Sequence, residues 1–196
     1  MAERGLTLIS HGGEESAVPS PDTQELGNPL RLRAALDAGV TVVVAHSASH
    51  GHSLDLDDPN HPRARAFDLF MRMMDDPQYN GRLYGEISAV LLFNRVSHAG
   101  PGLMARTDLH HRLVNGSDYP IPGINPLINL TQLWSLGLIR WEDKRGLSSL
   151  FRENPLLGDF VLKRVLCGPD GEPTGFPPSV FCPSREIFPS LSAHRG

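Results

Sequence analysis

The sequence contains little cysteine, and its two thiols stand apart from each other. Cys167 and Cys182 are the only cysteines among 196 residues, and they do not form a C-x-x-C pair of the kind that binds zinc. The opening Met1-Ala2-Glu3-Arg4 has no apolar segment of a secretion signal. We therefore expect a cytoplasmic protein with two free thiols rather than a disulfide.

Long apolar runs and clusters of positive charge are also missing. Apolar runs such as residues 40–45 are far too short to cross a bilayer. The net charge at pH 7 is −4, and lysine and arginine are scattered along the chain. We therefore expect neither a membrane nor nucleic acid as a partner. P-loop, Gly-x-Gly-x-x-Gly and Gly-x-Ser-x-Gly motifs do not occur, which removes the functions that depend on them.

Short β-rich runs recur along the chain. They predict four strands, at residues 5–10, 41–45, 82–88 and 112–115. The second run is a continuous series of β-branched residues, so we expect that strand to be buried on both faces.

Helix signals separate these runs. They predict helices at residues 30–38, along Phe67, Phe70, Met71 and Met74, at 102–110, and after Asn125-Pro126 and Asn154-Pro155. Asn followed by Pro is the N-cap and first-residue pair that opens a helix, and Asn28-Pro29 repeats it. The phenylalanines and methionines recur at helical spacing before Pro77, so we expect them to face a core.

Strands and helices alternate at spacings of roughly 30 to 42 residues, which predicts βαβ units and a parallel sheet. The fold class is therefore α/β. Length favours one compact domain, which we place at residues 1–168. Proline, glycine and serine dominate residues 169–196, so we expect an irregular tail on the surface there rather than a separate domain.

Polar side chains stand at or just past the end of each predicted strand: His11, His46, Ser88 and Asp118. Ligands and catalytic residues of parallel α/β folds gather at this edge, so these side chains could share a pocket. Each also has a simpler interpretation, because a single histidine is often structural and an aspartate after Gly-Ser often belongs to a turn.

Three motifs resemble, in their order, those of the amidohydrolase-related TIM-barrel hydrolases. They are His11-Gly12-Gly13-Glu14-Glu15, Ala45-His46-Ser47-Ala48-Ser49 and Asn115-Gly116-Ser117-Asp118-Tyr119-Pro120. The resemblance covers about residues 6–166 and implies strands five to eight of the barrel. The fold expected from it is the C-terminal half of a (β/α)8 TIM barrel.

The resemblance also implies roles for three residues. His11 would be the metal ligand of strand five, and Asp118 the ligand of the last strand and the general base. His46 would bind the metal or the substrate, while Ser88 matches no ligand of the family. Histidine and aspartate suit Zn²⁺, although Mn²⁺, Fe²⁺ or Co²⁺ would fit a mixed nitrogen and oxygen set.

The family's first four strands, with their His-x-His metal pair, have no counterpart before Leu6. His50-Gly51-His52, followed by Asp55, Asp57 and Asp58, could replace that pair, or it could be a solvated loop. A half barrel leaves edge strands and an apolar face unpaired. We therefore expect a homo-oligomer. The alternatives are a separate chain that supplies the missing half, or a chain that is the truncated product of a longer gene.

Other polar residues carry weaker expectations. Glu14 or Glu15 could orient His11, since metal-bound histidines commonly donate to a carboxylate. His110 precedes the fourth strand and is expected to be structural.

Two functions follow from these patterns. The first is a metal-dependent hydrolase, in which metal-activated water attacks a carbonyl-type carbon of a small-molecule substrate, as the resemblance implies. Some relatives are decarboxylases. The second is a catalytically incompetent half-barrel fragment that serves as an oligomeric scaffold or binding protein.

Overall fold

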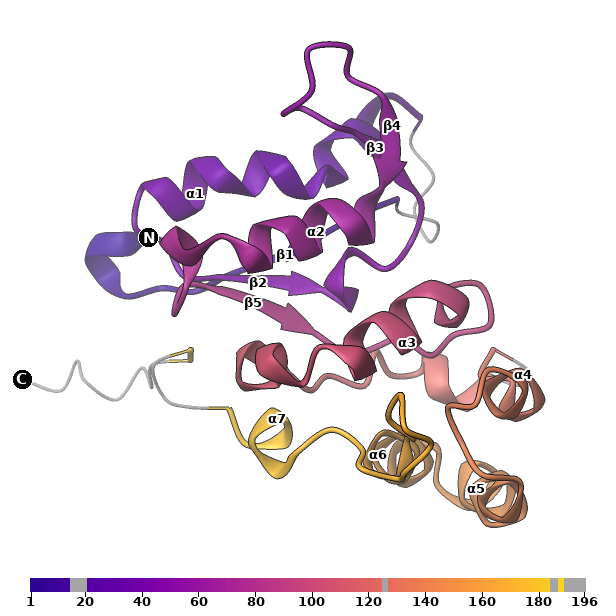
Figure 1. Cartoon of the computed structure of the whole chain (residues 1–196). Helices are drawn as coiled ribbons and strands as arrows, with labels where there is room; N and C mark the ends of the chain where they lie inside the picture. Colours follow the sequence, from indigo (N-terminus) through magenta and orange to yellow (C-terminus); the bar gives the residue numbers. More distant parts are fainter. Residues whose placement is uncertain (15–20, 125–126, 184–186, 189–196) are drawn as a thin grey trace, which may run out of the picture. The chain divides into compact units, whose positions relative to one another are not determined.

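The computed structural model describes residues 1–14, 21–124, 127–183 and 187–188 (Figure 1). The chain divides into two compact units. The first comprises Met1–Glu86 together with the end of the chain from Cys182, and the second comprises Ile87–Phe181. The units divide after Glu86 and after Phe181, not at residue 168, where the composition placed the end of the domain.

A parallel sheet forms the centre of the first unit. The strands of the sheet that belong to this unit are β1 (Leu8–His11), β2 (Val42–Ala45) and β5 (Leu83–Glu86), in which β2 lies between β1 and β5. His11 stands opposite Ala45, and Val44 opposite Gly85. The three valines of β2 are at most 1% exposed. The predicted parallel sheet and its fully buried strand are therefore confirmed.

Two helical segments follow β1 and β2 as expected. A 3-10 turn η3 (Pro29–Leu32) continues into α1 (Arg33–Asp37), and the Asn28 side chain accepts a hydrogen bond from the Leu30 N–H at 3.0 Å. The second is α2 (Ala66–Asp75), which packs against η3 and β5. Its Phe67, Phe70 and Met74 are buried, whereas Met71 is half-buried. The core-facing stripe of α2 is thus confirmed.

An antiparallel hairpin that was not predicted lies between β2 and α2. It consists of β3 (His52–Leu54) and β4 (Arg63–Arg65). The remaining short helices of this unit are η1 (Ala2–Arg4), η2 (Pro21–Gly27), η4 (His46–Ala48) and η5 (Pro77–Tyr79).

The second unit is mostly helical. Its elements are α3 (Val96–Ala105), η6 (Thr107–Arg112), β6 (Leu113–Val114), η7 (Ile121–Gly123), α4 (Leu130–Ser135), α5 (Trp141–Glu153), α6 (Pro155–Val165) and α7 (Pro178–Phe181). The Ile87 N–H, directly after β5, donates to the Val114 carbonyl at 3.0 Å. The Asn154 cap is confirmed, because its side chain accepts from the Leu157 N–H at 3.1 Å.

Two helix positions differ from the prediction. The helix placed at 102–110 is wrong, since α3 begins at Val96 and contains Pro101, and a separate 3-10 helix begins at Thr107. The burial of Val96 and Leu103 favours the earlier start, because both contribute to the core of this unit. The expected cap at residues 125–126 lies outside the described residues, and the cap observed for α4 is Asn129.

The region from residue 169 is not only an irregular surface tail. Phe176 and Val180 are at most 1% exposed, and the Asn115 N–H donates to the Val180 carbonyl at 2.8 Å. This part of the chain belongs to the core of the second unit, because two apolar side chains anchor it there. The expectation of a surface tail is therefore wrong for the residues around α7.

Both cysteines are free thiols, as expected, with Cys167 buried and Cys182 exposed. Burial raises the pKa of the Cys167 thiol above its ordinary value. Among the described residues, no helix is long and apolar enough to span a membrane.

Ion pairs hold the loop after β3. Arg72 donates to Asp55 at 2.7 Å, and Arg33 donates with two nitrogens to Asp57. These hydrogen bonds lower the pKa of both carboxyl groups below their ordinary values. Two of the three carboxylates that follow His50-Gly51-His52, those of Asp55 and Asp57, are therefore engaged with arginines.

Replacing Asp55 by asparagine is expected to remove an acid-sensitive part of the stability. Because the folded-state pKa lies below the unfolded one, the stabilisation is present above the unfolded pKa and is lost as the pH falls through the folded pKa. Asp55→Asn should cost about 1 kcal/mol of unfolding free energy at pH 7, since Arg72 is partly exposed. Urea unfolding between neutral and acidic pH measures this loss, which should vanish in acid.

Asp58→Asn is the matched control, because Asp58 lies in the same loop and forms no ion pair with the described residues. An equal loss of unfolding free energy in both variants, or a loss in Asp55→Asn that persists in acid, would contradict the role of the Asp55–Arg72 pair.

Candidate functional site

Two histidines meet where β1 and β2 end. His11 is the last residue of β1, and His46 follows the last residue of β2. Their ring centroids lie 5.3 Å apart, and the rings are inclined at 71°. The structure thus brings together two of the residues predicted for the metal site.

A carboxylate at the end of β5 contacts this pair. Glu86 Oε2 lies 3.6 Å from His46 Nδ1 and accepts a hydrogen bond from the His46 backbone N–H at 3.1 Å. Both side chains are 14% exposed. Ser47 Oγ donates to the Glu86 carbonyl at 3.0 Å. Glu86 therefore holds both the backbone and the ring of His46.

Glu86 is the residue of this cluster that the sequence analysis missed. The expected polar residue of the third strand was Ser88, which is 2% exposed and lies two residues beyond the end of β5. One feature of the sequence could have indicated Glu86, since it is an acidic residue inside the strand predicted at residues 82–88. A strand boundary two residues earlier would have placed a carboxylate at the edge of the sheet.

The turn after β2 adopts a left-handed backbone. His46, Ser47 and Ala48 have φ angles of 56°, 49° and 50°, and none of them is glycine. Such a conformation costs roughly 1 kcal/mol or more per residue, so surrounding contacts must enforce it. The bonds to Glu86 do so in part. Gly12 lies against this turn. A side chain at position 12 would clash with it, because its Cβ would stand 3.0 Å from the Cβ of Ala48 and only 2.6 Å from Val44 Cγ1.

Asp118 belongs to the second unit, whereas the two histidines belong to the first. It lies past β6, is exposed, and has a φ of 54°. Its carbonyl accepts a hydrogen bond from the Ile121 N–H at 2.9 Å, and Ser117 Oγ accepts one from the Tyr119 N–H at 3.3 Å. Asp118 therefore stands in a tight turn, as the simpler interpretation of the sequence also expected.

A buried lysine anchors the chain just before Asp118. Lys163 of α6 is 1% exposed, and its ammonium donates to Asn115 Oδ1 at 3.1 Å, to the Gly116 carbonyl at 2.8 Å and to Asp159 Oδ2 at 2.7 Å. These three acceptors satisfy the three donors of the ammonium group. The Asn115-Gly116 backbone is thus tied to α6.

Replacing Lys163 by methionine should destabilise the protein by about 3 to 5 kcal/mol, because it leaves a buried carboxylate without its cation. Urea unfolding measures the loss. The double variant Lys163→Met, Asp159→Leu removes both charges and is expected to recover much of it. A double variant no more stable than the single one would show that the ion pair is not what matters at this position.

The histidine before β6 is structural, as expected. His110 is 5% exposed, its Nε2 donates to the Leu103 carbonyl at 3.0 Å, and its ring lies 5.2 Å from that of Phe176. It therefore connects α3 with the segment around α7.

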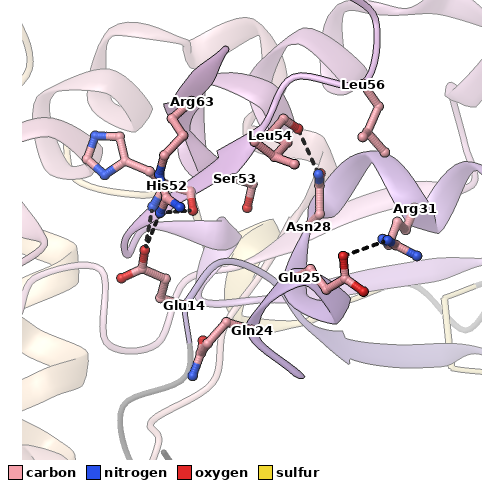
Figure 2. A pocket seen from close by; sticks show the side chains of 10 residues that line it. All are labelled: Glu14, Gln24, Glu25, Asn28, Arg31, His52, Ser53, Leu54, Leu56 and Arg63. Atoms are coloured by element: carbon pink, nitrogen blue, oxygen red, sulfur yellow. Dashed lines mark hydrogen bonds and ion pairs between the residues drawn. The ribbon is translucent and has the colours of Figure 1, made fainter. Parts of the chain in front are cut away.

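A cavity of about 390 Å³, most of whose lining residues are of polar or charged type, lies beside the segment that follows β1 (Figure 2). Glu14 points toward the hairpin, where Oε1 accepts from the His52 N–H at 3.2 Å and from Arg63 Nη2 at 3.1 Å. Across the cavity Arg31 donates to Glu25 at 3.3 Å. Glu14 thus fastens the hairpin rather than orienting His11, and Glu15 lies outside the described residues.

The ligands for a metal are incomplete within either unit. Across the described residues, neither unit contains a group of three or more His, Cys, Asp or Glu side chains that could hold a metal ion. His11 and His46 supply two imidazoles, whereas catalytic zinc usually takes three protein ligands. A third ligand would have to come from outside the described part of the first unit.

Comparisons with protein-family models, with curated proteins and with solved structures found no match to this chain. Its function must therefore be argued from the arrangement of its own side chains.

Proposed function

We propose that the chain is a metal-dependent hydrolase of the amidohydrolase type, acting on a carbonyl-type group of a small molecule. The observation that carries this proposal is the meeting of His11 and His46 at the carboxyl end of adjacent parallel strands. In α/β folds this edge of the sheet is where ligands bind and catalytic side chains collect.

His11 and His46 would bind the metal, with Asp118 as third ligand and general base. Glu86 is well placed to orient His46, since metal-bound histidines commonly have a carboxylate at their second nitrogen. A divalent cation held there, Zn²⁺ by preference, would supply Lewis-acid activation of water at neutral pH. Mn²⁺, Fe²⁺ and Co²⁺ are the alternatives for this donor set.

In this proposal the α/β fold of the chain corresponds to the C-terminal half of a (β/α)8 TIM barrel. In the described part of the first unit, β1 is an edge strand, and its Ile9 is 62% exposed. An exposed apolar edge strand favours pairing with another chain. A second copy, or a separate chain with the missing strands, would cover this edge.

The second candidate is a half-barrel fragment without catalytic activity that serves as an oligomeric scaffold. The observation that favours it is the incomplete ligand group in the described part of either unit. Metal binding separates the two candidates.

Zinc titration of the purified, untagged chain, with metal content measured by elemental mass spectrometry, tests the proposal. We expect about one metal per chain, and at least a tenfold weaker affinity in His11→Ala, His46→Ala and Asp118→Ala. Glu86→Gln should weaken binding by about 10-fold to 100-fold, because it removes the carboxylate beside a ligand.

His111→Ala is the matched control, since this exposed histidine follows α3 and its Nδ1 binds the Asp108 carbonyl. Its metal affinity should equal that of the unchanged protein. A folded chain that binds no metal, or that loses metal equally in the control, would contradict the hydrolase proposal and favour the scaffold.

A further inference from the structure

The chain's two tryptophans lie together on the surface of the second unit. Trp134 of α4 is 44% exposed and Trp141, the first residue of α5, is 57% exposed. Their rings meet edge to face with centroids 5.1 Å apart. Exposed tryptophan is characteristic of binding surfaces, because it buries a large apolar area at small entropic cost.

Basic residues continue this surface along α5. The ammonium of Lys144 stands 4.6 Å from the centre of the Trp141 ring. Arg145 and Arg152 follow on the same side of the helix, since successive residues turn by about 100° and positions 141, 144, 145, 148 and 152 fall within one third of a turn. We call the surface formed by Trp134, Trp141, Lys144, Arg145, Ser148 and Arg152 the α5 face.

The α5 face is hollowed and carries uncompensated charge. Five of its side chains, those on α5, line a depression of about 420 Å³. Within the described parts of the chain, no carboxylate forms an ion pair with Lys144, Arg145 or Arg152. The acidic residues of the same helix, Glu142 and Asp143 among them, turn away from the face by about 100° or more.

We propose that the α5 face binds an acidic segment of a partner protein. Charge complementarity supports this assignment, because three cations would meet carboxylates while the indole rings bury apolar side chains between them. Trp141 and Arg152 are about 16 Å apart along the helix axis, which matches three turns of a bound helix. This binding does not depend on the proposed hydrolase activity.

A carboxylate partner fits better than nucleic acid. The face offers only three cations, and the chain as a whole has a net charge of −4. Binding to a phosphate backbone draws its affinity from many cations and from a positive field, which this chain lacks.

Tryptophan fluorescence of the full chain tests the proposal, because the two tryptophans of the face are the only ones in the sequence. The probe is an acetylated peptide of leucine and glutamate of about 12 residues, long enough for three helical turns. Its glutamine counterpart and an oligothymidine serve as comparison ligands. Anisotropy of the labelled ligands provides a second readout.

The glutamate peptide should change the emission saturably, and added salt should weaken its binding. Arg152→Glu should reduce the affinity about tenfold or more, whereas Arg4→Glu, the same charge change at an exposed residue of the first unit, should leave it unchanged. No binding in either readout, equal binding of the glutamine peptide, or preferred binding of oligothymidine would overturn the proposal.

Discussion

The burial of β2 between β1 and β5 is the constraint on which the first unit depends. Three consecutive valines are removed from water there, and the backbone groups between them must find partners in the neighbouring strands. Parallel pairing satisfies those groups and aligns the strand ends, so that His11 stands opposite Ala45. Side chains at the strand ends are therefore brought together by the same bonds that bury the core.

Glu86 connects this sheet to its candidate site. Its carboxylate binds the His46 backbone and faces the ring, while its carbonyl accepts from Ser47. A left-handed turn of three non-glycine residues would be unfavourable by itself, and these contacts help to impose it. The orientation of His46 is therefore coupled to β5.

Lys163 has a comparable role in the second unit. A buried ammonium is costly unless its donors are satisfied, and here three oxygen atoms from two separate parts of the chain surround it. The segment that leads to Asp118 is thereby fastened to α6. In each unit a charged side chain thus fixes the backbone beside a residue that the sequence motifs single out.

Local patterns in the sequence were sufficient for strands β1, β2, β5 and β6, for the caps at Asn28 and Asn154, and for the buried stripe of α2, because each depends on residues close together in the chain. They did not predict the β3–β4 hairpin. They also placed His11 and His46 at strand ends. Only the tertiary structure identified Glu86 over Ser88, the Lys163 anchor, the buried segment around Phe176 and the exposed tryptophan pair. These features arise from contacts between residues far apart in the sequence, which short-range periodicity does not encode.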